Sequence, residues 1–355
     1  MDPILFMVAT LEGDAIHRIG VPPRDVDRDQ RRARDPPETA TIRPRSVSRP
    51  RVAQALDMCQ ACRAAGWKNG SRTLDGSAFA ARHIMNDTSL VVPIVDTDRL
   101  TRRFGELCAV DALTLTVMPG EALGLLGRNG AGKTTVIKML TTLLVPTSGH
   151  ATVAGFDIVK AAGAVRRAIG YVPQALSADG DLTGYENLLV FAKLYDLPRT
   201  ERAARIRDAL AFMDLSEFGD KLVKTYSGGM IRRLEIAQST LHRPRVLFLD
   251  EPTVGLDPIA RATVWSLVAR LRAEYRATVL LTTHYLDEAE QMCDRVAIMS
   301  RGRVTAIGSP RELAASVRPG ATFDEAFEHF TRDDAGLEGS YDEISQTRRT
   351  TQRLG

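Results

Sequence analysis

A lysine and a threonine at the end of a glycine-rich segment are the residues of this chain best suited to phosphate chemistry. The segment Gly127-Arg-Asn-Gly-Ala-Gly-Lys-Thr134 matches the pattern G-x-x-x-x-G-K-[ST] in full. Its glycines allow backbone amides to turn toward a phosphate, Lys133 adds a compact positive charge, and Thr134 offers a hydroxyl to Mg²⁺. Lysine is rare here, with only seven among 355 residues. The segment therefore predicts a site for the phosphates of a nucleotide.

The residues on either side of this segment have the order that such a site requires. The apolar run 122–126 before it predicts a buried strand, and apolar residues at helical spacing after it predict a helix. These apolar residues are Val136, Ile137, Met139 and Leu140. The start of that helix would direct its positive end at the same phosphates. A glycine-rich turn that binds no nucleotide is the alternative, and the order of strand, loop and helix disfavours it.

Two adjacent carboxylates, Asp250 and Glu251, follow a second apolar run at residues 246–249. Nucleotide sites form at the carboxyl ends of the strands of a parallel sheet. Asp250 is suited to the surroundings of Mg²⁺, whereas Glu251 is suited to act as a general base toward an attacking water. An acidic pair alone is weak support, but the strand before it and the turn Pro252-Thr-Val-Gly-Leu-Asp257 after it strengthen the interpretation. The pair predicts hydrolysis of the nucleotide.

A third motif is specific to far fewer protein families than the first two. Tyr226-Ser-Gly-Gly-Met230, which precedes an amphipathic helix and then the acidic strand, resembles the signature motif of ABC ATPases. A serine and two glycines at a helix start form a second anion cradle, which a chain with its own phosphate loop needs only if two chains share a nucleotide. The resemblance implies a head-to-tail dimer with a second copy of the chain. In that dimer Ser227, Gly228 and Gly229 would act on the ATP bound by the other copy.

Other positions of this family match one by one, and their roles are what the resemblance implies. Gln174, after Gly170-Tyr-Val-Pro, resembles the Q-loop glutamine that senses Mg²⁺ and the γ-phosphate. Asp257 resembles the D-loop aspartate that bridges the dimer. His284, after Leu280-Leu-Thr-Thr, resembles the H-loop histidine that contacts the γ-phosphate. A lone histidine after a strand is more often structural, but this one completes an ordered set of motifs.

The resemblance therefore implies a complete site for ATP and Mg²⁺. Glu251, His284 and Gln174 are expected to be catalytic, and Thr134, Gln174 and Asp250 to surround the metal. Phe104 fits the aromatic that stacks on adenine, although an aromatic in an edge strand is often part of the core. The expected nucleotide-binding residues are Phe104, Gly127, Asn129, Gly130, Gly132, Lys133, Thr134, Thr135, Ser227, Gly228, Gly229 and Asp257.

The elements that must position these residues are predicted to form an α/β fold. From residue 91 onward short apolar runs alternate with helical patterns, which is typical of a parallel sheet. The alternation of Leu113, Leu115 and Val117 predicts an antiparallel edge sheet. The fold class is a P-loop NTPase of the ABC ATPase type, with a mainly parallel core sheet, an antiparallel β subdomain and an inserted α-helical subdomain. That subdomain is expected at about residues 175–230.

Domain organisation is predicted from breaks in composition. Residues 1–90 are rich in Arg, Asp, Pro and Ala and are expected to be a largely disordered extension. Cys59 and Cys62 form a C-x-x-C within it, but no second pair completes a zinc set. Residues 91–317 are expected to be the ATPase domain, and residues 318–355 a C-terminal helix with a mobile tail.

Composition limits the partners and the compartment. The chain carries 47 Lys and Arg against 44 Asp and Glu, a net charge of +3, so no nucleic acid is expected as a partner. Four cysteines are too few for a disulfide scaffold, which fits a reducing compartment. No apolar run reaches the roughly 18 to 20 residues that span a bilayer. The resemblance to ABC ATPases adds a membrane partner, and it implies a place at the cytoplasmic face of the cell membrane as a peripheral subunit of a polytopic permease.

Two further motifs concern the direction of transport. Thr225-Tyr-Ser-Gly-Gly-Met230 and Thr283-His-Tyr-Leu-Asp-Glu-Ala-Glu290 resemble bacterial drug exporters of the daunorubicin-resistance type, which are of the ABC-2 class. The resemblance implies that the chain binds and hydrolyses ATP to energise export of a drug or antibiotic through a separate permease. The sequence leaves open the cargo, the permease and whether the dimer has two identical copies.

Two other functions compete with this one. A soluble ABC ATPase that acts on ribosomes or DNA has the same catalytic set, but such proteins usually have two cassettes or long coiled-coil insertions. Here the insertion is short and lacks heptads. A P-loop GTPase or small-molecule kinase is the second alternative. The chain has no N-K-x-D guanine motif, and the signature loop would then have no role.

Overall fold

A computed structural model describes residues 92–332 of the chain. The predicted disordered extension at residues 1–90, with Cys59 and Cys62, lies outside the described residues, and so does the predicted tail beyond residue 332. Everything below concerns the described region.

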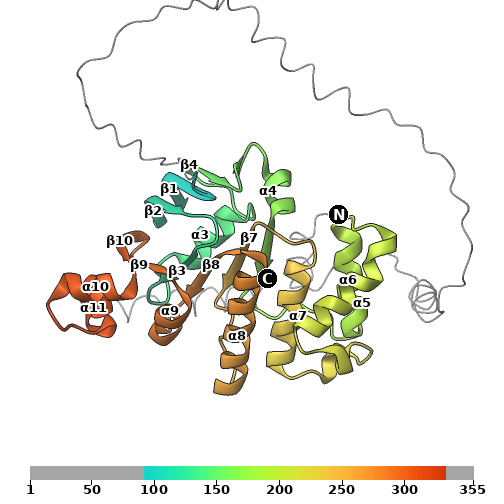
Figure 1. The fold of residues 1–355 in the computed structure, drawn as a ribbon. Coiled ribbons are helices and arrows are strands. Elements are labelled where there is room, and N and C mark those ends of the chain that lie inside the picture. Colours follow the sequence, from blue (N-terminus) through green and yellow to red (C-terminus); the bar gives the residue numbers. More distant parts are fainter. Residues whose placement is uncertain (1–91, 333–355) are drawn as a thin grey trace, which may run out of the picture. The chain divides into compact units, whose positions relative to one another are not determined.

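A six-stranded sheet forms the centre of the described region (Figure 1). Its strand order is β10-β9-β3-β8-β7-β6, with β10 antiparallel to β9 and the other neighbours parallel. The strands are β3 (Ala122–Leu126), β6 (Ile169–Val172), β7 (Val246–Asp250), β8 (Thr278–Thr283), β9 (Arg295–Ser300) and β10 (Arg303–Gly308). Every residue of β3, β6, β7 and β8 is buried, as expected of parallel strands covered on both faces.

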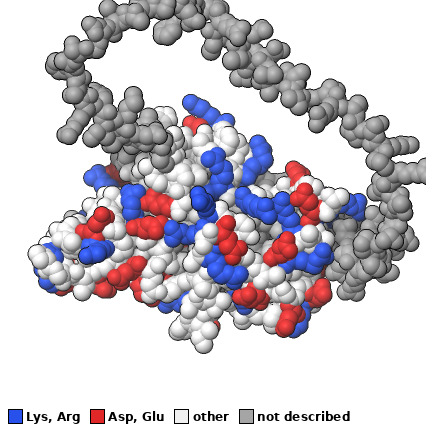
Figure 2. Space-filling model, in the orientation of Figure 1, with Lys and Arg blue, Asp and Glu red and all other residues white. Residues whose placement is uncertain are grey.

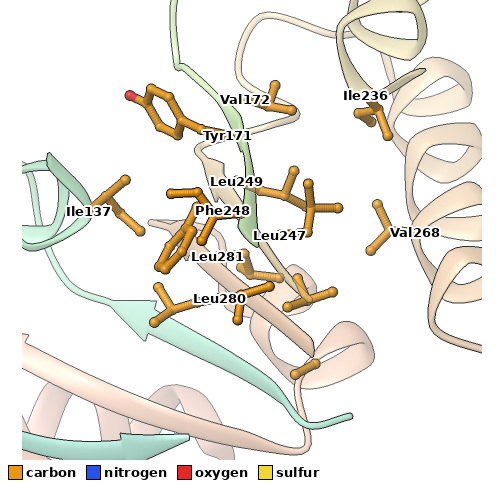
Figure 3. Packing of buried hydrophobic residues seen from close by; sticks show 14 of the residues in the cluster. Ile137, Tyr171, Val172, Ile236, Leu247, Phe248, Leu249, Val268, Leu280 and Leu281 are labelled. Carbon is orange, nitrogen blue, oxygen red and sulfur yellow. The ribbon is translucent and has the colours of Figure 1, made fainter. Parts of the chain in front are cut away.

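Helices cover both faces of this sheet because successive side chains of a strand point to opposite faces. In Figure 3, Ile137 of α3 (Lys133–Leu140) lies on one side of β7 and β8, and Val268 of α8 (Pro258–Tyr275) lies on the other. Phe248 and Leu280 are fully buried between these layers. Two further helices that contact the core sheet are α4 (Ala162–Ala168), at β6, and α9 (Leu286–Met292), at β3 and β8.

A second, antiparallel sheet has the order β2-β1-β4-β5. Its strands are β1 (Val95–Phe104), β2 (Leu107–Val117), β4 (Ser148–Val153) and β5 (Phe156–Asp157). The predicted alternation in β2 is confirmed, because Leu113, Leu115 and Val117 are all buried. The sheet contacts the core through β2, which lies against β10 and α3.

Three helices group at the end of the molecule opposite α10 and α11 (Figure 1). They are α5 (Gly184–Leu194), α6 (Arg199–Phe212) and α7 (Gly228–Thr240), with short 3-10 turns η4 (Ser216–Phe218) and η5 (Val223–Thr225) between α6 and α7. A capping box starts α5: Thr183 Oγ1 accepts from the amide of Glu186, whose carboxylate accepts from the amide of Thr183. α7 packs on α5 and α6 and also on β6 and α8, so it joins the helical part to the core.

The chain continues beyond β10 into a helical pair. α10 (Pro310–Val317) packs against α11 (Phe323–Phe330), and α11 also contacts α9 and β9. The phenylalanines of α11 face this contact, with Phe323 buried and Phe327 and Phe330 partly buried. The pair therefore packs on α9 and β9 through an apolar face.

The predicted fold class is confirmed: a mainly parallel core sheet, an antiparallel sheet and an inserted helical part all occur in the described residues. Among the helices of that region, none combines the length and apolar character needed to traverse a membrane. On the face shown in Figure 2, acidic and basic side chains are interspersed over the described residues. A mixed surface of this kind gives no long-range field of one sign.

The imidazole of His242 predicts a pH dependence of folding. Its Nε2 lies 3.0 Å from the carbonyl oxygen of Ile169, and its ring stacks on Tyr195 with 3.6 Å between ring centroids. Burial lowers the pKa of His242 from 6.5 to about 4, with the Ile169 carbonyl opposing the change. The unfolded chain therefore binds a proton near pH 6.5 that the folded chain binds only near pH 4. Stability should fall by at most about 3 kcal/mol as pH decreases through this window.

Urea unfolding at pH 7.5, 6, 5 and 4 measures this effect. His242→Gln keeps an N–H donor for Ile169 but does not titrate, so its free energy of unfolding should fall less over the same window. If the free energy of unfolding changed equally with pH in the two proteins, the effect would not come from His242.

Candidate active site

The phosphate-binding loop has a backbone that its glycines make possible. Gly130 and Gly132 have φ values of 83° and 101°, a region that side chains other than glycine rarely adopt. A Cβ on Gly132 would lie 2.4 Å from the carbonyl oxygen of Ala109, whereas a Cβ on Gly130 would meet nothing within 4 Å. The loop is therefore packed against β2 at Gly132 and open to solvent at Gly130. Asn129 is exposed beside it.

Lys133 folds back over its own loop. Its Nζ donates to the carbonyl oxygens of Gly127 at 2.7 Å and Arg128 at 3.2 Å. The same nitrogen lies 3.6 Å from Glu251 Oε1, and both side chains are almost fully buried. Burial lowers the pKa of Lys133, and the Glu251 carboxylate opposes that change. A buried ammonium group at the phosphate loop is suited to bind an anion.

Asp250 is anchored by hydroxyls from two neighbouring elements. Its Oδ1 accepts from Thr134 Oγ1 at 3.1 Å and from Thr282 Oγ1 at 2.6 Å. Burial raises the pKa of Asp250, whereas the two hydroxyl donors oppose the rise. The strand register explains the second contact, because Asp250 and Thr282 are paired residues of β7 and β8. The oxygens of Thr134 and Asp250 are the type of donor that Mg²⁺ prefers.

Glu251 is the point at which the predicted catalytic residues meet. Its Oε2 accepts from Gln174 Nε2 at 2.9 Å, and its Oε1 lies 3.2 Å from His284 Nδ1 as well as near Lys133. Its backbone φ is 48°, in the left-handed region that non-glycine residues rarely occupy. This turn ends the regular extended course of β7. One carboxylate thus contacts residues from the phosphate loop, the β6 end and the β8 end.

The parallel register brings these groups to one edge. β6 pairs with β7, and β7 pairs with β8, so Val172, Leu249 and Leu281 lie at corresponding heights. Gln174, Glu251 and His284 each follow within three residues of those positions and therefore emerge at the carboxyl ends of adjacent strands. β3 pairs with β8 in the same direction and delivers the phosphate loop to that edge.

The signature residues take part in different contacts. Ser227 caps α7, its Oγ accepting from the amide of Met230 at 3.3 Å. Gly229 faces α8 so closely that a Cβ would lie 2.8 Å from Ala260 Cβ. Asp257 caps α8 by accepting from the amides of Ile259 and Ala260. Ser227, Gly228 and Asp257 are exposed.

Phe104 lies at the end of β1, in the hairpin whose other strand supports the phosphate loop at Ala109. Phe104 is 42% exposed. The guanidinium of Arg102 lies over its ring, 4.5 Å from the ring centroid. An exposed ring at this place is available for stacking. Thr135, in the first turn of α3, is partly buried.

Sequence reasoning missed a third buried carboxylate, which lies behind the site. Glu288 accepts hydrogen bonds from Thr253 Oγ1 and from Thr283 Oγ1, the latter at 2.6 Å, and is almost fully buried. It connects the turn after Glu251 to the residue before His284. Thr282, which binds Asp250, was also missed. Its place opposite Asp250 follows from the register of β7 and β8, which the sequence alone does not give.

Two alanine substitutions separate backbone strain from collision in the phosphate loop. Gly130→Ala meets only an unfavourable φ, whereas Gly132→Ala meets the same strain and also the Ala109 carbonyl. Gly132→Ala is therefore expected to lower the free energy of unfolding by about 2 kcal/mol more than Gly130→Ala. Urea unfolding without nucleotide is the measurement, and equal losses would contradict the packing described for Gly132.

Comparison with known proteins places these motifs in a family. A sequence profile described as ABC transporter matches residues 110–254. The chain is 46% identical over 231 residues to the daunorubicin resistance ATP-binding protein DrrA3 of Streptomyces coeruleorubidus, which covers 65% of this chain and 71% of that protein. It is 43% identical over 226 residues to the Nod factor export ATP-binding protein I of Burkholderia thailandensis, which covers 64% of this chain and 74% of that protein.

A solved structure gives the same result. A protein described as the ATP binding subunit of an ABC transporter aligns with a TM-score of 0.61 and 29% identity, covering 67% of this chain and 99% of that one. The recognition of the family from its motifs is thereby confirmed. The chain belongs to the ABC transporter ATP-binding family, the ATPases that drive transport through a separate membrane permease.

Proposed function

We propose that this chain hydrolyses ATP with Mg²⁺, as one half of a head-to-tail dimer, to export a drug or antibiotic through a polytopic permease. The single observation that carries the catalytic part is the convergence of Lys133, Gln174 and His284 on the carboxylate of Glu251. The names of relatives that confer daunorubicin resistance or export Nod factor support export as the direction.

In this proposal the phosphate loop holds the ATP. The amides of Gly127, Asn129, Gly130 and Gly132 bind the phosphates, together with those at the start of α3. Lys133 exchanges its carbonyl contacts for phosphate oxygens, because a phosphate offers a stronger, charged acceptor. Thr134 and Thr135 complete the cradle in the first helical turn.

Thr134, Asp250 and Gln174 carry side-chain oxygens of the type that binds Mg²⁺. The Thr134 hydroxyl and the Asp250 carboxylate are already joined by a hydrogen bond, and the side chain of Gln174 approaches from the β6 end. We place these three residues around the metal, which when bound would neutralise charge on the β- and γ-phosphates. Thr282 holds Asp250 in orientation by donating to its Oδ1.

Glu251 is placed as the general base. Its carboxylate accepts a proton from water as the water oxygen bonds to the γ-phosphorus and the bond from that phosphorus to the β,γ-bridging oxygen breaks. His284 lies on the Oε1 side, from which it can reach the γ-phosphate, and Gln174 lies on the Oε2 side. ADP and phosphate are the products.

The signature residues are assigned to the second copy of the dimer. Ser227, Gly228 and Gly229 stand at the amino end of α7, where amides and helix dipole favour an anion. They would contact the γ-phosphate bound by the other chain, Asp257 would bridge the two chains, and Phe104 would stack on adenine. The exposure of Ser227, Gly228 and Asp257 is compatible with this assignment.

We assign the domain organisation and location accordingly. We assign residues 91–317 to the ATPase domain, with the helical subdomain at about 175–230 as the part that meets the permease, and the C-terminal helix to the segment 318–355, of which the structure describes residues 318–332. The exposed Leu176, beside Gln174, belongs to the surface expected to receive the permease. Association with that protein would hold the chain at the cytoplasmic face of the membrane.

The Mg²⁺ assignment predicts a specific effect of Thr134. Thr134→Val removes the hydroxyl but keeps the shape, so about tenfold more Mg²⁺ should be needed for half-maximal hydrolysis. Thr134→Ser keeps the hydroxyl and should need the same Mg²⁺ concentration as the unmodified chain. Mg²⁺ titrations of the ATPase rate measure the difference, and a normal requirement in Thr134→Val would remove this residue from the metal site.

The transport assignment is tested by trapping the ATP-bound state. Glu251→Gln should slow hydrolysis about 100-fold or more and accumulate the dimer with its partners. Gentle solubilisation of cell membranes and mass spectrometry should then recover a polytopic membrane protein. The additional change Lys133→Met, which removes the charge that binds phosphate, is the control and should abolish this recovery. Recovery of ribosomal or DNA-repair proteins without a membrane protein would instead favour a soluble ABC ATPase.

A further inference from the structure

A buried ion pair on α7 lies outside the groups that contact the phosphates or Glu251. Arg232 and Glu235 are one turn apart on α7, with Nη1 and Oε2 separated by 3.0 Å. Their side chains are 1% and 0% exposed, so neither reaches solvent. Burial lowers the pKa of Arg232 and raises that of Glu235, and each partner opposes the change in the other.

Both side chains bind the segment that contains Gln174. Arg232 donates through Nη1 to the carbonyl oxygen of Pro173 at 2.6 Å and through Nη2 to that of Gln174 at 2.7 Å. Glu235 Oε1 accepts from the amide of Ser177 and from its hydroxyl, the latter at 3.1 Å. Residues 173–177 are therefore attached to α7 at both ends.

An ion pair would be a poor choice for this buried position if packing were its only role. Burying two charges is often less favourable than burying a well-packed apolar pair of the same volume. The ion pair adds hydrogen bonds of fixed geometry. The planar guanidinium binds two carbonyls and a carboxylate at once through nitrogens held in a fixed plane, whereas an apolar side chain binds none of them and a lysine has a single nitrogen on a flexible stem.

The same helix carries the signature residues. Ser227 caps α7 only five residues before Arg232, and the intervening residues are joined by helical hydrogen bonds. Gln174, whose carbonyl oxygen accepts from Arg232, donates through its side chain to Glu251. A continuous set of contacts thus runs from the Glu251 carboxylate through residues 173–177 to the buried ion pair on α7.

We propose that Arg232 and Glu235 clamp residues 173–177 to α7, so that Gln174 and Ser227 change position together when ATP binds. This inference rests on the proposed function, in which Gln174 faces one nucleotide and Ser227 faces the other. The pair acts as positioning residues and does not contact the nucleotide. Through it, the occupancy of one site adjusts the signature serine that serves the second site.

The test replaces the pair by an apolar pair. Arg232→Met with Glu235→Leu removes both charges together, whereas a single change leaves one buried charge without a partner. The control is Arg202→Gln in α6, since Arg202 also donates to a main-chain carbonyl, that of Leu197, but does not bind residues 173–177. Arg232→Lys, which keeps the charge, serves as a second variant if the double change fails to fold.

Two measurements on the full chain are compared. Steady-state hydrolysis should show kcat reduced about tenfold with KM for ATP nearly unchanged in the double variant, because misplaced groups slow the chemical step. Hydrogen exchange, at a concentration where light scattering shows a monomer, should show that ATP alters both 173–178 and 226–231 in the unmodified chain. In the double variant ATP should alter only the first segment. Arg232→Lys should give the same pattern with a smaller loss of kcat, and Arg202→Gln should match the unmodified chain.

The results that would contradict the clamp differ from those that would contradict the proposed function. Normal kcat, or a response of 226–231 to ATP that persists in the double variant, overturns the clamp while leaving the proposed function intact. Failure of the unmodified chain to bind fluorescent ATP overturns the proposed function and the clamp together.

Discussion

The contacts of one carboxylate, Glu251, depend on nearly every element of the core. Gln174 follows β6, His284 follows β8, and Lys133 begins α3, yet all three reach the same two oxygens. Such convergence requires parallel strands in fixed register, so that their carboxyl ends share one edge. The left-handed backbone at Glu251 turns the chain out of β7 at that edge. The fold can therefore be understood as a means of holding charged groups around an anion site.

Buried polar groups give this arrangement its rigidity. Asp250 is fixed by hydroxyls from α3 and β8, and Glu288 joins the turn after Glu251 to the end of β8. Each buried carboxylate has its partners, as low-dielectric surroundings demand. The consequence is preorganisation: the groups are oriented before the substrate arrives, which is the main requirement of phosphoryl-transfer catalysis.

Much of this could be predicted from the sequence because the motifs are local. The strand 122–126, the glycine loop and the helix after it lie in one continuous segment, and the structure has a strand at Ala122–Leu126 and a helix from Lys133. Arg232, Glu235 and Glu288 could not be identified in this way. Their importance comes from burial against residues 35 to 59 positions away in the chain, and no short pattern encodes that contact. The roles in the dimer could be predicted only by resemblance, since one chain holds half of each proposed site.

The most direct test of the account is a crystal structure of the Glu251→Gln chain with Mg²⁺ and ATP. We predict two nucleotides between two copies, each with its phosphates on Lys133 of one copy and its γ-phosphate contacted by Ser227 of the other. We also predict that residue 251 faces the γ-phosphate. ATP bound to a single chain with no contact from a second signature segment, or bound away from Lys133, would contradict the account.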